Sequence, residues 1–148
     1  MKSAAFQRLH LIGICGTGMA GLAIMLTELG HAVSGSDDGV YPPMSDVLAA
    51  RGIAVGPFSE DNLRAPLDGI VIGAGVSRRN AEFVAASEGS VPLLSFPEAL
   101  ARFVLPGHAA HVVAGTHGKT TTSSMLAVIH RAAGTGAGMF IGGVPKDF

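Results

Sequence analysis

The hydrophobic positions of this chain form short apolar runs that alternate with longer segments of helical spacing. Short runs bounded by glycine, proline or serine predict buried strands, and the longer segments predict helices that pack on a sheet. We expect strands at 10–14, 32–35, 53–55, 69–72 and 91–94, and helices at 19–29, 45–50, 81–87 and 97–104. Ser45 and Ser95 are candidate N-caps. Alternating strands and helices predict an α/β fold, a Rossmann-like parallel sheet with helices on both faces.

A break at Pro106-Gly107 separates this pattern from a second one. Beyond the break we expect a strand at 109–114, a glycine-rich loop and a helix at 120–133. These elements are the start of a second α/β domain. The sequence therefore predicts one domain at 1–107 and the truncated start of another at 108–148.

Composition narrows the classes of function. Hydrophobic residues make up 48% of the 148 residues, so the chain has enough apolar side chains for a sizeable core. A net charge of −1 and the absence of Trp argue against a nucleic-acid partner, which needs basic and stacking groups. The glycines within the apolar stretch from Leu9 to Leu26 weaken an isolated helix and argue against a membrane span. The single cysteine, Cys15, cannot form an internal disulfide, and we expect a cytoplasmic protein.

The first candidate site is a glycine loop between a predicted strand and a predicted helix, Gly16-Thr17-Gly18-Met19-Ala20-Gly21. A turn with this spacing brings the N–H groups of a helix N-terminus close to a pyrophosphate. Asp37 follows the second predicted strand, where an acidic residue meets a ribose hydroxyl in such folds. The motif leaves open whether the nucleotide is NAD, FAD or a UDP-sugar, and a glycine turn that only packs a helix on a sheet is the alternative. We interpret Cys15 as a small buried side chain and not as a nucleophile.

The second candidate site is Gly115-Thr116-His117-Gly118-Lys119-Thr120-Thr121. Gly-Lys-Thr is the functional end of a P-loop, in which backbone N–H groups and the Lys bind phosphates and the Thr ligates Mg²⁺. Fewer residues separate the two glycines than in the general pattern. We expect this loop to bind ATP, with His117 either facing the nucleotide or filling the loop.

Two phosphate loops in this order resemble those of the Mur ligases, whose ATP loop typically reads Gly-Thr-x-Gly-Lys-Thr-Thr, as residues 115–121 do. The run from His10 to Met19 is similar to the muramate-binding branch of that family. Tyr41-Pro42-Pro43-Met44-Ser45, the ATP loop extended to Met125, and Ile141-Gly142-Gly143-Val144-Pro145 are similar to the murein peptide ligases within that branch.

The resemblance implies an ATP- and Mg²⁺-dependent ligase that joins UDP-N-acetylmuramate to L-alanyl-γ-D-glutamyl-meso-diaminopimelate in peptidoglycan recycling. Lys119 would be catalytic, because it would stabilise the transferred phosphoryl group, and Thr120 would hold Mg²⁺. The implied ATP-binding residues are Gly115, Thr116, His117, Gly118, Lys119, Thr120 and Thr121. The implied substrate-binding residues are Cys15, Gly16, Thr17, Gly18, Met19, Ser36, Asp37, Gly73, Ala74, Gly75 and Asn80. The family often has Pro after that Asn, whereas this chain has Ala81.

The resemblance covers the whole chain, but the chain corresponds only to the N-terminal part of such ligases. It holds the sugar-nucleotide domain and the start of the ATPase domain, without a C-terminal domain or further Mg²⁺ ligands. We therefore expect it to be inactive alone, and we expect exposed apolar faces of the truncated domain to promote self-association. Three alternatives remain: a fragment of a UDP-N-acetylmuramate–L-alanine ligase, a non-catalytic nucleotide-binding module, and an NAD-dependent oxidoreductase domain.

Overall fold

The structure is a computed structural model, and it describes residues 7–141 of the chain. The chain divides into two compact units, residues 1–108 and 109–148.

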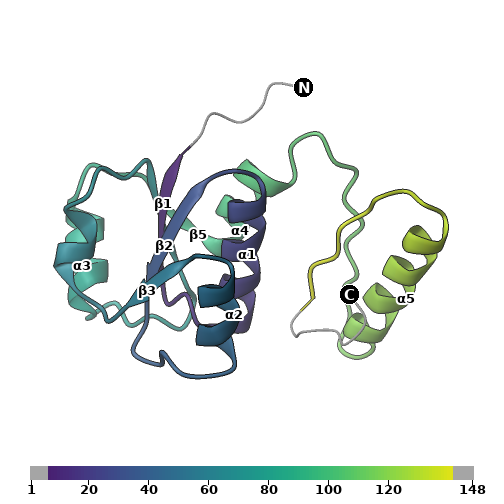
Figure 1. Cartoon of the computed structure of the whole chain (residues 1–148), viewed down its shortest axis with the longest axis horizontal. Helices are drawn as coiled ribbons and strands as arrows, with labels where there is room; N and C mark the ends of the chain where they lie inside the picture. Colours follow the sequence, from purple (N-terminus) through teal and green to yellow (C-terminus); the bar gives the residue numbers. More distant parts are fainter. Residues whose placement is uncertain (1–6, 142–148) are drawn as a thin grey trace. The chain divides into compact units, whose positions relative to one another are not determined.

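The first unit is built on a five-stranded parallel sheet with the strand order β3-β2-β1-β4-β5 (Figure 1). The strands are β1 (Arg8–Ile12), β2 (Ala32–Ser36), β3 (Ala54–Gly56), β4 (Gly69–Ile72) and β5 (Leu93–Ser95). The sheet grows outward from β1 in one direction up to β3, and β4 then pairs with the other side of β1. This reversal places a topological switch point between β1 and β4, where open α/β sheets bind ligands at the carboxyl ends of their strands.

Helices cover both faces of the sheet, as Figure 1 shows. One face carries α1 (Thr17–Glu28), α2 (Met44–Ala50), α4 (Phe96–Ala99) and the π-helix η2 (Leu100–Val104). The other face carries α3 (Ala81–Glu88) and the 3₁₀-helix η1 (Glu60–Leu63). The predicted Rossmann-like α/β fold, with helices on both faces of a parallel sheet, is therefore confirmed. The helix predicted at 97–104 is α-helical only in its first part.

The two faces of the sheet differ in chemistry. Side chains alternate along β1, so that Leu9 and Leu11 enter the core under α1, while Ile12 belongs to a smaller apolar cluster under α3. His10 points to the same side as Ile12, where its ring meets Glu82 of α3. The α1 face is thus held by apolar packing, whereas the α3 face combines a small apolar cluster with buried polar groups.

Helix capping was predicted correctly at one site and wrongly at another. At α4 the carboxylate of Glu98 accepts hydrogen bonds from the hydroxyl and the backbone N–H of Ser95, both at 2.7 Å, which confirms Ser95 as the cap. These bonds, first from the hydroxyl and then from the backbone, lower the pKa of Glu98. The prediction of Ser45 as a cap is wrong. α2 begins at Met44, after Pro43, because the proline ring already restricts φ to values that suit a helix start.

The described residues of the second unit form one helix, α5 (Lys119–Ala132), and the irregular segments on either side of it. The strand predicted at 109–114 is wrong, since this segment has no regular structure and Val112 is 87% exposed. A strand needs a neighbouring strand to satisfy its backbone groups, and the described residues of this unit contain none. Residues 142–145 of the Ile141–Pro145 run lie outside the described residues.

None of the helices in the described part of the chain combines the length and hydrophobicity that a bilayer crossing requires.

Candidate functional site

The turn between β1 and α1 forms the first part of the site. Gly13 has φ +82°, and a Cβ atom there would lie 2.7 Å from Cγ2 of Val76, so glycine is required for both its conformation and its lack of a side chain. The backbone N–H groups of Gly13 and Ile14 donate to the carbonyl of Ser36 at 2.8 and 3.1 Å. The turn is therefore anchored to the end of β2.

The start of α1 leaves backbone donors available for an anion. The helix begins at Thr17, no side chain caps it, and the first helical bond is from Ala20 N–H to the carbonyl of Gly16 at 2.8 Å. The amides of residues 17–19 thus have no acceptor within the helix, and they lie at the positive end of its dipole. A Cβ atom on Gly18 would come no nearer to another residue than 3.9 Å, from the Phe96 ring. The sequence predicted this arrangement of loop and helix, which suits a phosphate.

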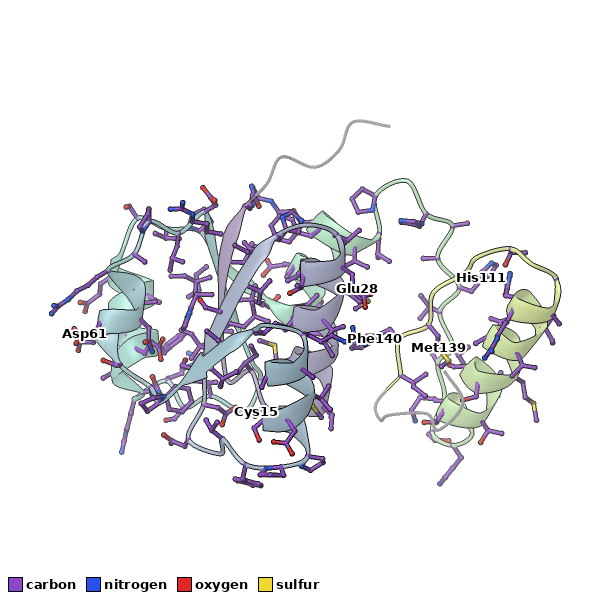
Figure 2. The ribbon with its side chains drawn as sticks, in the orientation of Figure 1. Cys15, Glu28, Asp61, His111, Met139 and Phe140 are labelled. Atoms are coloured by element: carbon purple, nitrogen blue, oxygen red, sulfur yellow. The ribbon has the colours of Figure 1, made fainter. Side chains whose placement is uncertain are left out.

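Asp37 connects the loops that follow β1 and β2. Its carboxylate accepts from the N–H of Cys15 at 2.8 Å and from the N–H of Gly39 at 2.9 Å. Burial, and then the charge of Asp37, raise the pKa of the Cys15 thiol, so the thiol is protonated at neutral pH. Cys15 (labelled in Figure 2) is half-buried and packs against the apolar core, which favours a packing role over that of a nucleophile.

A hollow of about 340 Å³ lies beside Asp37, at the carboxyl ends of β2 and β3. Its lining residues are Asp37, Asp38, Val40, Tyr41, Val55, Gly56 and Pro57. Tyr41 is 69% exposed and offers a ring for stacking, and the two aspartates offer acceptors for hydroxyl groups. This combination suits a nucleoside. The sequence predicted Asp37 as a site residue but missed Tyr41 and the end of β3. The signal that could have found them is that these residues lie at the carboxyl ends of two neighbouring parallel strands.

Ser36 is the last residue of β2, directly before Asp37. Its side chain is fully buried, and its hydroxyl lies beside the Glu82 carboxylate. What Ser36 contributes to the site is its carbonyl, which holds the glycine turn.

The segment from Gly73 to Asn80 lies on the other side of the switch point. Gly73 is buried, and its N–H donates to the carbonyl of Ile12 at 2.9 Å, whereas Ala74 and Gly75 are exposed. The Asn80 side chain accepts from the N–H of Phe83 at 3.1 Å and so caps α3. The glycine turn and this segment therefore follow β1 and β4 at the carboxyl edge of the sheet, where open α/β sheets bind ligands.

The second predicted loop surrounds the N-terminus of α5. Gly118 is its N-cap residue, with φ +76°, a conformation that favours glycine. The ammonium of Lys119 donates to the carbonyls of Gly115 at 2.6 Å and Thr116 at 3.1 Å, which folds the side chain over the loop. Residues 115–121 are all exposed. The loop therefore brings a cation and first-turn amides to one exposed spot, as phosphate binding requires.

The fit of this loop to Mg²⁺ is partial. Thr120 stands in the first turn of α5 and offers one hydroxyl oxygen. The described residues contain no group of three or more His, Cys, Asp or Glu side chains that could hold a metal ion. Mg²⁺ is commonly held by phosphate oxygens and water with few protein ligands, so an ion here would be shared with a bound nucleotide.

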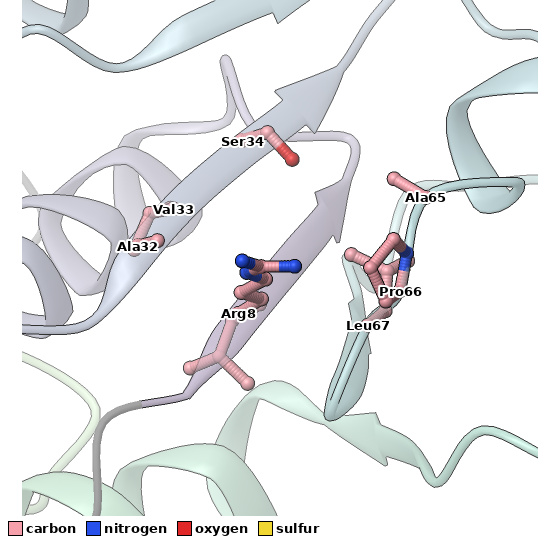
Figure 3. Close-up of a pocket in the computed structure, with 8 residues that line it drawn as sticks. Arg8, Ala32, Val33, Ser34, Ala65, Pro66 and Leu67 are labelled. Carbon is pink, nitrogen blue, oxygen red and sulfur yellow. The ribbon is translucent and has the colours of Figure 1, made fainter.

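A second hollow, of about 310 Å³, opens at the opposite end of the sheet (Figure 3). It is bordered by the beginnings of β1 and β2 and by the loop that precedes β4, and is lined by Arg8, Leu9, Ala32, Val33, Ser34, Ala65, Pro66 and Leu67. None of the predicted site residues lines it. The predicted nucleotide site and this hollow are therefore separate.

Comparison with known families shows the family of the chain. Residues 8–108 match the family described as Mur ligase family, catalytic domain. The chain belongs to the Mur ligase family. Among Mur ligases it is 44% identical over 143 residues to the UDP-N-acetylmuramate–L-alanyl-γ-D-glutamyl-meso-2,6-diaminoheptandioate ligase of Escherichia coli strain K12. The aligned region covers 96% of this chain and 31% of that protein. The chain is 39% identical to a UDP-N-acetylmuramate–L-alanine ligase of Rubrobacter xylanophilus, over 95% of this chain and 31% of that one.

Solved structures support the same assignment. The ligase structure from Neisseria meningitides, described as MPL, matches with a TM-score of 0.91 and 44% identity, covering 97% of this chain and 45% of that one. The similarity to murein peptide ligases that the motifs predicted is confirmed. The chain spans about a third of the length of the curated relatives it matches.

Proposed function

We propose that the first unit binds UDP-N-acetylmuramate and that residues 115–121 begin the ATP site of a ligase. The observation that carries the proposal is the first turn of α1, which no side chain caps and which follows β1 at the carboxyl edge of the sheet, the edge that also holds the hollow beside Asp37. In this arrangement the amides of residues 17–19 bind the diphosphate, and the Asp37–Tyr41 hollow takes the uridine. Gly73 to Gly75, with Asn80 behind them, border the sugar.

The reaction proposed for the whole ligase is amide formation driven by ATP. The muramic acid carboxylate attacks the γ-phosphorus, an acyl phosphate forms and ADP leaves. The amine of L-alanyl-γ-D-glutamyl-meso-diaminopimelate then attacks the acyl carbon, and phosphate leaves. In this chain Lys119 places its charge where the transferred phosphoryl group accumulates negative charge. Mg²⁺, when bound with the nucleotide, would neutralise phosphate charge, with Thr120 as a protein ligand.

We propose that this chain alone does not ligate. Residues 115–121 are all exposed, so water reaches the ATP loop, and the described residues contain no group of three or more His, Cys, Asp or Glu side chains that could hold a metal ion. ADP release that requires both UDP-N-acetylmuramate and the tripeptide would contradict this proposal.

Calorimetric titration of the purified chain with UDP-N-acetylmuramate tests the binding proposal, with NAD as the control ligand. We expect saturable binding of the UDP-sugar and none of NAD. Binding of NAD alone would instead support the oxidoreductase interpretation, and binding of neither would overturn both.

The amino substrate has a second candidate, L-alanine, because alanine ligases also match nearly the whole chain. The Tyr41–Ser45 stretch favours the tripeptide. A longer protein that contains this segment, assayed with L-alanine and with the tripeptide as competing amines, would separate the two.

A further inference from the structure

A buried polar cluster lies under the start of α3, and Ser36, one of the residues assigned to the site, contributes a hydrogen bond to it. Nε2 of His10 contacts Oε1 of Glu82 at 2.8 Å, and Nδ1 of His10 contacts the hydroxyl of Ser34 at 2.8 Å. Glu82 also accepts from the side-chain amide of Asn62 at 3.2 Å and from the N–H of Ser59 at 3.3 Å. The side chains of His10 and Glu82 are 3% and 0% exposed, so this cluster belongs to the interior.

The chemistry of the cluster fixes its protonation pattern. Burial alone would raise the pKa of Glu82, but the hydrogen bonds from His10, Ser36 and Asn62 and the proximity of the His10 ring outweigh burial and lower it. Glu82 is therefore an ionised carboxylate, which only accepts hydrogen bonds, and Nε2 of His10 must donate to it. A carboxylate buried with several donors holds those donors in place, because each would be left unpaired if the group moved.

The cluster joins elements that are far apart in sequence. His10 lies on β1, Ser34 on β2, Asn62 on η1 and Glu82 in the first turn of α3. Ser34 also lines the hollow at the beginnings of β1 and β2 (Figure 3). The cluster ties the first turn of α3 directly to the central strand of the sheet.

Two loops of the proposed binding site depend on the strand and helix that the cluster joins. β1 continues into the glycine turn, and α3 is the continuation of the Gly73–Asn80 segment. These loops also meet each other, because Val76 stands against Gly13 and the N–H of Gly73 donates to the carbonyl of Ile12. The start of α3 therefore sets how closely the segment approaches the glycine turn.

We propose that Glu82, through His10, is a positioning residue that holds the Gly73–Asn80 segment against the glycine turn and so sets the width of the sugar-nucleotide crevice. That this crevice binds a ligand rests on the proposed function. Glu82 does not reach the ligand. It acts because the apolar cluster on the α3 face is small, so the place of α3 depends on polar contacts.

Hydrogen exchange of the free protein tests the positioning without any ligand. Glu82→Gln keeps the shape of the side chain, but turns an amide N–H₂ toward donors that faced a carboxylate. We expect amides of residues 74–80 to exchange at least about fivefold faster, while the amides of β1 and β2 change by less than about twofold. Asn62→Ala removes one donor at a half-buried position and should show the same effect more weakly. Glu28→Gln, which breaks the exposed 2.6 Å pair with Arg51, is the control and should change neither set.

The same variants are then titrated with UDP-N-acetylmuramate. We expect about tenfold weaker binding by Glu82→Gln, an intermediate effect of Asn62→Ala and none of Glu28→Gln. The positioning role is overturned if exchange rises equally throughout the sheet, or if residues 74–80 keep their wild-type exchange rates. If Glu82→Gln does not fold, the exchange rates of Asn62→Ala decide between these outcomes. Faster exchange with unchanged affinity would overturn the link to the crevice. A wild-type chain that does not bind the UDP-sugar would overturn the proposed function, and the exchange result would still judge the positioning role.

Discussion

The backbone N–H of Cys15 donates to the carboxylate of Asp37 across 2.8 Å, and this bond ties the glycine turn to the loop after β2. The sequence pattern predicts that Asp37 contacts a ribose hydroxyl. Its carboxylate also accepts hydrogen bonds within the protein, from the N–H groups of Cys15 and Gly39. The residue is therefore part of the support of the site as well as part of its surface.

Removing the Asp37 carboxylate should cost both stability and affinity. Asp37→Ala leaves the N–H groups of Cys15 and Gly39 without their acceptor, and we expect about 1–2 kcal/mol lower stability. Asp37→Asn keeps one acceptor oxygen and should lose about half as much. Urea unfolding with a titration of UDP-N-acetylmuramate measures both effects. A variant with wild-type stability would show that neither bond matters in solution.

Substitution of Gly18 should impair binding without impairing the fold. A Cβ atom there meets only the Phe96 ring, at the ordinary contact distance of 3.9 Å, so Gly18→Ala should unfold near the wild-type temperature. It should bind the UDP-sugar about tenfold more weakly, because the methyl group stands where the diphosphate approaches the amides. Gly18→Asp adds a negative charge and should abolish detectable binding. Calorimetry alongside thermal unfolding checks this, and undiminished affinity of Gly18→Asp would remove the loop from the site.

Lys119 should matter for nucleotide binding through its charge and its compact shape. Its ammonium closes the loop on the carbonyls of Gly115 and Thr116, which places the charge at the start of α5. We expect Lys119→Ala to weaken ATP binding at least about tenfold, as measured by a fluorescent ATP analogue. Lys119→Arg should recover only part of the affinity, because a planar guanidinium does not reproduce the ammonium geometry. Equal affinity of all three proteins would exclude the loop as an ATP site.

His31 should make the protein less stable as the pH falls. Its ring is 4% exposed, lies 5.5 Å from the Phe103 ring, and has no hydrogen-bond partner at either nitrogen within the described residues. Burial lowers the pKa of His31. Above pH 6.5 the His31 ring is neutral in both the folded and the unfolded chain, so it does not change the free energy of unfolding with pH. Below pH 6.5 the ring takes up a proton in the unfolded chain but not in the folded chain.

Stability should therefore decline from about pH 6.5 downward, with a slope from this group of at most about 1.4 kcal/mol per pH unit. His31→Leu should flatten that part of the curve of melting temperature against pH. The matched control is His108→Gln, at an exposed position, which should leave the curve as it is. An unchanged curve for His31→Leu would show that the ring is hydrated in the folded state.

The exposed face of α5 should make the chain self-associate. Met125, Val128 and Ile129 lie on one side of the helix at helical spacing and are 61%, 54% and 63% exposed. We expect concentration-dependent association in sedimentation velocity experiments. Val128→Lys with Ile129→Lys should shift the chain to monomer. Ser90→Lys, an added charge on the first unit, should not. A wild-type chain that stays monomeric at high concentration would contradict this expectation.

The elements of the first unit could be predicted because each is encoded locally. The run at 69–72 and the helix at 81–87 are recognisable from their own residues, since alternation and helical spacing reflect burial on a sheet. The strand at 109–114 was predicted by the same reasoning and does not form. Its apolar pattern describes a segment that needs a neighbouring strand, and no local property states whether the neighbour exists.

The candidate site was predicted in part for the same reason. The two glycine loops have local signatures, because a glycine spacing at a strand–helix junction reflects the backbone conformation of that junction. The hollow beside Asp37 that Tyr41 lines was not predicted, since which residues after β2 reach the surface depends on how the loop folds back on β3.

The sequence alone therefore determined the order of strands and helices in the first unit, the two glycine loops and the family, because these depend on residues that are close together in the chain. Only the tertiary structure decided that Asp37 supports Cys15, that His10 meets Glu82 and that residues 109–114 stay without a partner strand. The physical reason is that hydrogen-bond partners and burial between distant segments are set by the packing of the sheet, and no local pattern specifies them.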